Sequence, residues 1–326
     1  MNQFQYIRPS KQQAAIEAVA RDANAKFIAG GTNLVDLMKR GVMAPQKLVD
    51  INRLPLAKIE HENGGLRIGA LALNSAVADD RQVRERQPLL AQAINAGASA
   101  QLRNMATTGG NMLQRTRCPY FYDTALPCNK REPGTGCGAL EGINRMHAIF
   151  GFSDKCIAVH PSDMSVALVA LDATVLVSGP KGDRRIPFAD LHRLPGDTPE
   201  KDTTLEPGEL ITAVDVPDGP FTKHVSYYKV RERASYAFAL VSAAVALDLD
   251  GNTIKAARLA FGGVAHKPWR LQTAEQFLVG KPATEETFRQ AAAVAMQGAK
   301  AFKHNEYKLK LAPNTLIQTL KNAAAA

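Results

Sequence analysis

The sequence lacks any apolar run that is long enough to cross a membrane. Its longest uncharged apolar stretch, from Ser235 to Leu247, is shorter than the roughly 20 residues that a membrane helix needs. The first residues, from Met1 to Arg8, have neither the basic start nor the apolar core of a secretory signal. We therefore expect no membrane span and no signal peptide in this sequence.

Clustered basic residues and the common dinucleotide motif are also missing. The 40 Lys and Arg residues outnumber 31 Asp and Glu residues and give a net charge of +9, but they are scattered and not interleaved with aromatic residues. This pattern argues against a nucleic-acid partner. No G-x-G-x-x-G motif occurs, which disfavours a Rossmann domain. With 326 residues, 45% of them hydrophobic, the chain can bury sizeable cores in two or three units.

Cysteine is scarce, and all of it lies in one segment. The four cysteines of the chain are Cys118, Cys128, Cys137 and Cys156, and we call residues 118–156 the cysteine loop. The loop is also rich in Gly, Pro and Asn. Thiols gathered in such a segment indicate a loop folded around a metal centre.

Three kinds of site compete for these thiols. Two disulfides would need an oxidising compartment, and a chain of this length needs no covalent staples. A structural zinc site usually contains C-x₂₋₄-C pairs, and none occurs here. A [4Fe–4S] cluster accepts widely spaced ligands from a wrapping loop, so it is the favoured interpretation. His147 and His160, inside and beside the loop, are then expected to pack or form hydrogen bonds, because four thiolates complete the cluster.

Two turns with paired glycines indicate a ligand that carries phosphate. The first glycine turn, Gly30-Gly31-Thr32-Asn33, follows a predicted strand at 26–29 and precedes a helical pattern that Thr32 or Asn33 could cap. The second glycine turn is Thr107-Thr108-Gly109-Gly110-Asn111. Glycine lets the main chain approach a phosphate closely, so the pair could hold the two phosphates of a dinucleotide. One such turn alone could equally be a tight αβ connection.

The order of the predicted elements is mixed and changes after a Pro-rich loop at 195–208. Before this loop, Asp163 lies at the start of an apolar helix and strand at 164–177, where periodicity favours a helix cap. After it, long antiparallel strands and two helices predict a separate C-terminal domain, a β-meander backed by helices. The predicted elements are strands at 48–51, 66–73, 224–231, 238–248 and 254–262, a short acidic helix capped by Asn74 or Ser75, and helices spanning 88–98, 285–302 and 314–322.

Several of these motifs resemble one known family. The segments at 27–34, 66–70, 103–111 and 161–164 are similar to the FAD-binding medium subunit of the molybdenum hydroxylases, and 261–269 resembles its C-terminal domain. This family includes xanthine dehydrogenase, carbon monoxide dehydrogenase and aldehyde oxidoreductases. The cysteine loop narrows the resemblance to the FAD subunit of a periplasmic aldehyde oxidoreductase. 4-Hydroxybenzoyl-CoA reductase also has a cluster in this subunit, but its flanking residues are less alike.

The resemblance implies an α+β fold with noncovalent FAD, since no histidine stands where related flavoproteins attach theirs. Residues 1–220 would form a two-lobed FAD-binding domain of the vanillyl-alcohol-oxidase (PCMH) type, with a [4Fe–4S] loop at 118–156. Residues 221–326 would form a CO dehydrogenase flavoprotein-type C-terminal domain. Asp163 would bond a ribityl or ribose hydroxyl, and Lys229 would lie near the isoalloxazine, although its surroundings depart from the family's commoner Arg-Arg-Asp sequence. The pyrophosphate and ribityl chain would be held by Lys26, Phe27, Ile28, Ala29, Gly30, Gly31, Thr32, Asn33, Leu34, Thr107, Gly110, Asn111 and Leu113.

The implied activity is electron transfer inside a larger enzyme. A large partner subunit would carry the molybdenum cofactor, and a small one the [2Fe–2S] centres. Electrons would pass from those centres to FAD and on to an external acceptor. A free-standing FAD oxidase would need a substrate base, and no residue can be nominated for that role; a zinc-stabilised scaffold is the alternative from another class. The resemblance also implies export to the periplasm with a signal-bearing partner, the alternative being the cytoplasm.

Overall fold

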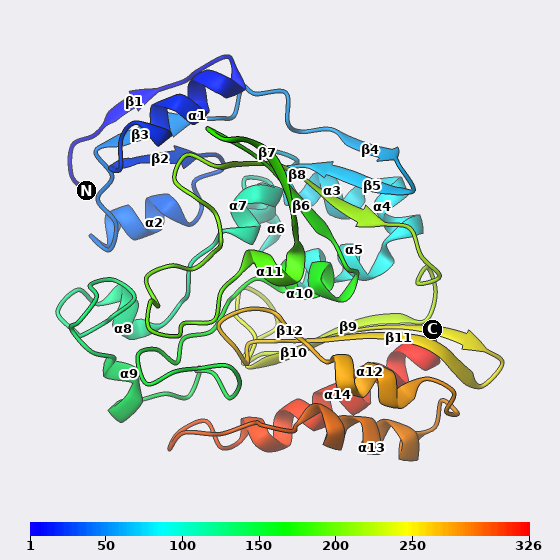
Figure 1. The fold of residues 1–326 in the computed structure, drawn as a ribbon. Helices are drawn as coiled ribbons and strands as arrows, with labels where there is room; N and C mark the ends of the chain where they lie inside the picture. Colours follow the sequence, from blue (N-terminus) through cyan, green and yellow to red (C-terminus); the bar gives the residue numbers. More distant parts are fainter.

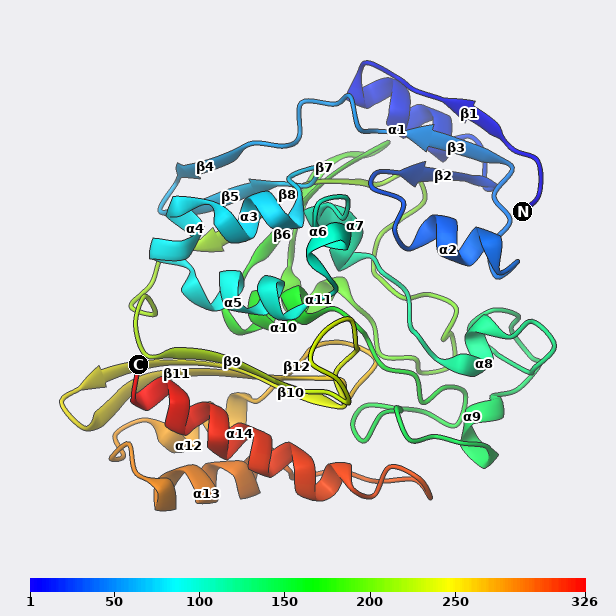
Figure 2. The same cartoon turned by 180° about the vertical axis from the view of Figure 1, so that it is seen from behind.

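The computed structural model describes residues 1–326 and arranges them in three layers, each built on its own sheet (Figures 1 and 2). The N-terminal lobe and a second lobe lie above the C-terminal sheet, whose helices form the bottom of the molecule in Figure 1. The cysteine loop projects at one side, around two short helices, α8 (Pro119–Tyr122) and α9 (Gly138–Glu141).

The first lobe is a small parallel sheet with strand order β1-β3-β2. Strands β2 and β3 cover the predicted strands at 26–29 and 48–51, so both predictions are confirmed. Ala15 and Ile16 of helix α1 pack with Val49 in the small core of this lobe. The elements are β1 (Gln5–Ile7), α1 (Gln12–Ala20), β2 (Ala25–Ile28), α2 (Leu34–Lys39) and β3 (Lys47–Asp50).

The second lobe is a five-stranded antiparallel sheet with strand order β4-β5-β8-β6-β7. Helix α10 is buried along its whole length, because it lies between this lobe and the C-terminal sheet, where an apolar surface all round is stabilising. The elements are β4 (Ile59–Glu62), β5 (Gly65–Gly69), α3 (Asn74–Asp79), α4 (Arg81–Arg86), α5 (Pro88–Ala96), α6 (Ala100–Arg103), α7 (Thr108–Met112), α10 (Asp163–Ala170), β6 (Thr174–Gly179), β7 (Gly182–Pro187), α11 (Phe188–Leu191) and β8 (Leu210–Pro217).

The C-terminal layer is an antiparallel sheet with strand order β12-β11-β10-β9, as the predicted meander requires. One face contributes Ala244, Ala246 and Ala260 to the core that contains α5 and α10, and the other face packs against three helices. Gly251, at a φ of 58°, makes the predicted turn between the two longest strands. The elements are β9 (Val225–Val230), β10 (Val241–Asp250), β11 (Thr253–Gly262), β12 (Trp269–Arg270), α12 (Gln272–Leu278), α13 (Glu285–Ala295) and α14 (Lys308–Ala324).

The structure corrects several element boundaries. Helix α13 ends at Ala295 and not at 302, because Gly298 adopts a φ of 80° and the chain then leaves the helix. Helix α14 begins at Lys308, six residues before the prediction at 314. Neither Asn74 nor Ser75 caps helix α3, because that helix already includes both residues.

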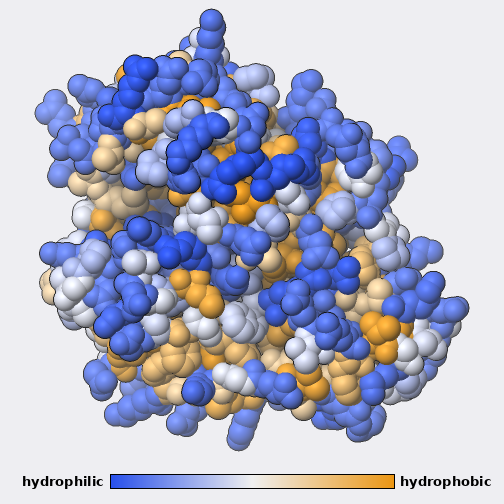
Figure 3. All heavy atoms as spheres, in the orientation of Figure 1, coloured by the Kyte–Doolittle hydropathy of each residue, from blue (hydrophilic) through white to orange (hydrophobic).

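None of the helices combines the length and the apolar character that a membrane span requires. The face shown in Figure 3 is mainly hydrophilic, with smaller hydrophobic patches scattered between polar side chains.

Candidate cofactor-binding site

The first glycine turn presents unpaired backbone donors. The N–H groups of Gly30, Gly31, Thr32 and Asn33 donate to no acceptor in the protein. Gly30, Gly31 and Asn33 are partly exposed and Thr32 is exposed, but the side-chain Nδ2 of Asn33 is a buried atom without a partner. A buried donor normally finds an acceptor, and successive free N–H groups bind anions, so this turn fits a phosphate group that the protein itself does not supply.

Asn33 occupies the N-cap position of helix α2, but its side chain does not cap that helix. Its Oδ1 instead accepts a hydrogen bond from the backbone N–H of Arg115, 3.0 Å away. Thr32 does not cap the helix either. The predicted position of the helix start is therefore confirmed, and the predicted capping bond is wrong.

The second glycine turn uses its donors within the fold. The N–H of Thr108 donates to Ala72 O, that of Gly109 to Ala70 O, and that of Gly110 to the Thr107 hydroxyl. The two turns therefore differ, since only the first offers free donors. The second turn is closely packed, because a Cβ on Gly109 would lie 3.1 Å from the Ala70 side chain and one on Gly110 would lie 3.0 Å from Thr107 Oγ1.

Both turns line a single cleft of about 1100 Å³. The chain segments that form them touch, because a Cβ on Gly30 would lie 1.8 Å from the carbonyl oxygen of Met105. A neighbouring cleft of about 1660 Å³ shares Thr32, Asn33 and Gly110 with the first. The first cleft brings together the predicted residues Lys26, Phe27, Ile28, Ala29, Gly30, Gly31, Thr32, Asn33, Leu34, Thr107, Gly110 and Leu113, and the second adds Asn111 and Asp163.

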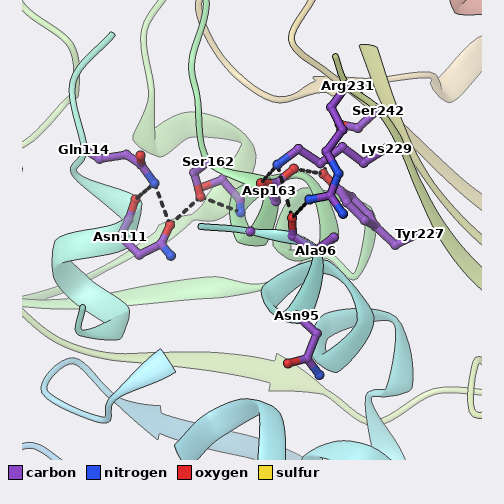
Figure 4. Close-up of polar contacts among 12 residues, drawn as sticks. Asn95, Ala96, Asn111, Gln114, Ser162, Asp163, Tyr227, Lys229, Arg231 and Ser242 are labelled. Carbon is purple, nitrogen blue, oxygen red and sulfur yellow. Dashed lines mark hydrogen bonds and ion pairs between the residues drawn. The ribbon is translucent and has the colours of Figure 1, made fainter. Parts of the chain in front are cut away.

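Asp163 lies at the wall of the second cleft and is held by an ion pair (Figure 4). Its Oδ2 lies 2.8 Å from Lys229 Nζ, and its Oδ1 accepts a 2.7 Å hydrogen bond from the Tyr227 hydroxyl. Burial and the charge of Asp163 raise the pKa of Tyr227 well above its usual value. Ser162, and not Asp163, caps helix α10, because its Oγ accepts from Ser165 N. The cap that periodicity favoured for Asp163 is therefore wrong.

Lys229 lines neither cleft. Its Nζ is buried behind Asp163 and also donates to the carbonyl of Ala96, 3.2 Å away, which accepts from Arg231 as well. The sequence predicts Lys229 beside a flavin. In the structure its side chain lies behind Asp163, which separates it from the second cleft.

The side chain of Asn111 is fixed in a defined orientation. Its Oδ1 accepts hydrogen bonds from the Ser162 hydroxyl at 2.6 Å and from Gln114 Nε2 at 2.9 Å. Two donors to Oδ1 identify this atom as the amide oxygen, which leaves the amide nitrogen available toward the cleft. A bound hydroxyl or phosphate oxygen is the group that such a nitrogen can bind.

A partly buried ionic cluster connects the clefts to the cysteine loop. Asp202, in the predicted loop at 195–208, pairs with Arg115 at 2.6 Å and with Lys130. Burial raises the pKa of Asp202, but the charges of Lys130 and Arg115 outweigh this effect and hold the pKa well below its usual range. Arg115 lines the first cleft and lies 4.7 Å above the Phe121 ring in helix α8. The Arg115 guanidinium therefore contacts both the first cleft and the cysteine loop.

Three histidines pack beside this ionic cluster. The rings of His160 and His192 lie 4.2 Å apart, and His266 lines the same small cavity of about 300 Å³. Burial lowers the pKa of His192 and of His266 to about 4. Both are therefore neutral, hydrogen-bonded core residues, and His160 agrees with its predicted packing role.

The cysteine loop gathers its four thiols without a disulfide. The backbones of Cys128 and Cys137 pair as an antiparallel bridge. Burial, with smaller contributions from the nearby thiols of Cys128 and Cys156, raises the pKa of Cys118 to about 12, although backbone N–H groups that donate to its sulfur oppose this shift. Burial likewise raises the pKa of Cys156 to about 11, with contributions from Cys137 and Cys128.

The donor set of the loop consists of thiols. No three His, Cys, Asp or Glu side chains lie close enough to form a site for one metal ion. The thiol of Cys118 lies near those of Cys128 and Cys156, and the thiol of Cys156 also lies near that of Cys137. Four cysteine thiolates are the donors that an iron–sulfur cluster takes, so the chemistry of this donor set fits such a group.

His147 contacts this group of thiols directly. Its Nε2 lies 3.1 Å from Cys118 Sγ, and its Nδ1 has no partner. The ring is buried. This is the hydrogen-bonding role that the sequence suggested for His147.

Sequence reasoning missed the residues that join these parts, namely Arg115, Lys130, Asp202, Ser162 and Tyr227. Ser162 could have been found, because Ser immediately before an apolar helix is a common cap. The others act through partners far away in the sequence, such as Lys130 and Asp202, 72 residues apart. No local pattern signals such pairs.

Comparison with protein families decides the class of this cleft. Residues 2–219 match the model described as the FAD binding domain in molybdopterin dehydrogenase. The chain belongs to this FAD-binding family. Residues 226–323 match the CO dehydrogenase flavoprotein C-terminal domain. The predicted oxidoreductase flavoprotein class and the predicted two-lobed α+β fold are thus confirmed.

Individual relatives are similar in sequence to this FAD-binding chain over most or all of its length. It is 51% identical to the aldehyde oxidoreductase FAD-binding subunit PaoB of Escherichia coli K12, covering 100% of this chain and 99% of the relative. It is 29% identical to the glyceraldehyde dehydrogenase medium chain of Sulfolobus acidocaldarius, covering 89% and 86%. Among solved structures it is similar to carbon monoxide dehydrogenase from Hydrogenophaga pseudoflava, with a TM-score of 0.78, 25% identity and coverage of 99% and 98%.

Proposed function

We propose that this chain is the FAD-carrying electron-transfer subunit of a molybdenum-containing aldehyde oxidoreductase. The observation that carries the proposal is the set of unpaired donors at the first glycine turn, which faces the second glycine turn across one cleft. The named relatives support the substrate class, since PaoB and the glyceraldehyde dehydrogenase chain both serve enzymes acting on aldehydes. A FAD subunit of another molybdenum hydroxylase, such as a 4-hydroxybenzoyl-CoA reductase, is the alternative.

In this proposal the chain's residues bind and orient the cofactor. The N–H groups of Gly30, Gly31 and Thr32 and the amide of Asn33 bind the pyrophosphate, and the Asn111 amide binds a hydroxyl of the ribityl region. Asp163, fixed by Lys229 and Tyr227, accepts a hydrogen bond from a ribityl or ribose hydroxyl. When bound, FAD supplies a carrier that accepts electrons one or two at a time.

The cysteine loop holds a [4Fe–4S] cluster in the same proposal. Cys118, Cys128, Cys137 and Cys156 are its ligands, and the choice is supported by the confinement of all four cysteines of the chain to one loop, where they form no disulfide. When bound, the cluster supplies a one-electron site. Arg115 and Lys130, both paired with Asp202, hold the loop against the FAD-binding lobe.

The partners are part of the same proposal, and family membership supports them. A small subunit with [2Fe–2S] clusters delivers electrons, a large subunit with the molybdenum cofactor oxidises the substrate, and an external acceptor receives the electrons. The isolated chain is therefore expected to oxidise no aldehyde, whereas the three-subunit complex does. Aldehyde oxidation by the chain alone would contradict this division of roles.

We place the complex in the periplasm, carried there by a signal-bearing small subunit. Fractionation of cells with and without that subunit tests the location. We expect the chain in the periplasm only when the partner is present. Equal periplasmic amounts in both strains would refute carriage, and a purely cytoplasmic chain would favour a cytoplasmic hydroxylase.

A visible spectrum and an elemental analysis of the purified chain test the cofactors together. We expect flavin bands with a broad iron–sulfur shoulder, and four irons per chain as the proposed cluster requires. Flavin bands alone would leave the FAD proposal standing and remove the cluster. One zinc and no flavin would overturn both in favour of a scaffold.

A further inference from the structure

We propose that His147 donates a hydrogen bond from its Nε2–H to the sulfur of Cys118 and thereby raises the reduction potential of the cluster. This inference rests on the cluster that the preceding section proposes. The direct observation is the 3.1 Å separation between Nε2 and Sγ, inside a buried part of the loop. His147 is thus a positioning residue that acts through Cys118.

The backbone of His147 is held in place independently of Cys118. Asn305 Nδ2 donates to the backbone carbonyls of His147 and Ala148, at 3.2 and 3.1 Å. Lys308 Nζ donates to the same His147 carbonyl at 2.9 Å and to Gly263 O at 2.7 Å. Asn305 and Lys308 are completely buried. The C-terminal domain therefore holds the backbone of His147 in place, and its ring reaches the sulfur from there.

The contact has one chemically consistent direction. A thiolate that binds iron has no proton and can only accept a hydrogen bond. Neutral imidazole carries a single N–H, and Nδ1 of His147 has no acceptor within reach. The proton therefore belongs on Nε2, where Cys118 accepts it.

Cys118 differs from the other three ligands in having this donor. The other sulfur that accepts a hydrogen bond is that of Cys156, from the backbone N–H of Ala158 at 3.5 Å. Hydrogen bonds to the ligand sulfurs stabilise the more negative, reduced cluster, so they raise its reduction potential. A side-chain donor at one corner also makes the four iron positions inequivalent.

Redox titration of the full chain, purified with its cofactors, tests the inference. His147→Leu removes the donor and keeps an apolar side chain of similar bulk, whereas His147→Gln retains an N–H. We expect His147→Leu to keep its iron and FAD but to titrate at a lower cluster potential, with the flavin potential unchanged. His147→Gln is expected to restore most of the shift.

His160→Leu is the matched control, because it also removes a packed imidazole beside the cysteine loop, but one that contacts the Ser165 hydroxyl and no cysteine sulfur. We expect this variant to keep the wild-type cluster potential. An unchanged potential in His147→Leu would overturn the inference. Equal shifts in His147→Leu and His160→Leu would also overturn it, since loss of a packed ring would then explain both.

Wild-type protein labelled with ¹⁵N-histidine gives a second measurement that does not depend on the stability of the Leu variant. Pulsed EPR of the reduced cluster is expected to detect a weak histidine ¹⁵N coupling that disappears in His147→Gln. No coupling would refute the hydrogen bond, and a strong coupling would mean that the ring binds iron directly. A wild-type chain without iron would instead refute the cluster itself.

Discussion

The carboxylate of Asp163 lies 2.8 Å from the ammonium of Lys229, and their side chains are only 8% and 3% exposed. The two residues are 66 positions apart, one at the start of helix α10 and the other in strand β9. Their pairing therefore ties the FAD-binding domain to the C-terminal sheet at the wall of the cleft.

Lys229→Met is expected to destabilise the flavin-free chain by about 3–5 kcal/mol, because it leaves Asp163 buried without its counter-charge. Urea unfolding measures the change. The double variant Asp163→Leu/Lys229→Met removes both charges and should recover much of the loss. Lys58→Met breaks an exposed pair with Glu60 and serves as the control, with an effect below about 1 kcal/mol. An equally small effect for Lys229→Met would show that the buried pair contributes little.

Gly31→Val is expected to weaken FAD binding by about tenfold or more, equivalent to about 1.4 kcal/mol. Gly31 adopts a φ of 72°, and its Cβ would lie 3.1 Å from the Val35 side chain, so the free donors beside it would move. FAD per chain, measured by absorbance, is the readout. Gly64→Val is the matched control, with a φ of 76° in open space. Gly110→Val should also lose FAD, and full FAD in both cleft variants would refute the site.

Replacing any one of Cys118, Cys128, Cys137 or Cys156 by Ser is expected to lower the iron content and bleach the iron–sulfur shoulder. Most FAD should remain, because the free donors of the first glycine turn belong to another lobe. Iron analysis and the visible spectrum are the measurements. A single variant with unchanged iron would remove that cysteine from the ligand set.

Stability is expected to fall as the pH is lowered from about 6.5 to about 4, in part through His192 and His266. Their folded pKa of about 4 lies below the unfolded value of 6.5, so the unfolded chain binds more protons in this window. Each histidine contributes a slope of up to about 1.4 kcal/mol per pH unit. Urea unfolding at several pH values should show a shallower slope for His192→Gln and His266→Gln. His304→Gln, at an exposed position, is the control, and parallel slopes in all variants would refute the assignment.

Local sequence signals predicted the elements that are defined by a contiguous pattern of residues. The turn at Asp250-Gly251-Asn252 joins two long apolar strands, and that hairpin is present. The strand before the first glycine turn is present too. Strand β1 was missed because it is a short, exposed edge strand, without the alternation of buried and exposed residues that marks most strands.

The site was predictable where a motif is contiguous and not where it is assembled by folding. Both glycine turns and all four cysteines could be nominated from the sequence. The ionic cluster of Arg115, Lys130 and Asp202 could not, because its members come from separate loops and their charges look like ordinary surface charges. Asp163 shows the same limit. Periodicity favoured a helix cap for it, but its carboxylate forms an ion pair with Lys229, 66 residues away.

The contact between Asn305 and His147 has a consequence for biosynthesis. The two residues are separated by 158 positions, so the ribosome makes the whole C-terminal sheet after it has made the cysteine loop. Until Asn305 and Lys308 emerge, the segment that carries His147 lacks the side chains that bury its backbone. The backbone of His147 can therefore reach its buried, hydrogen-bonded state only after the start of the last helix has been synthesised.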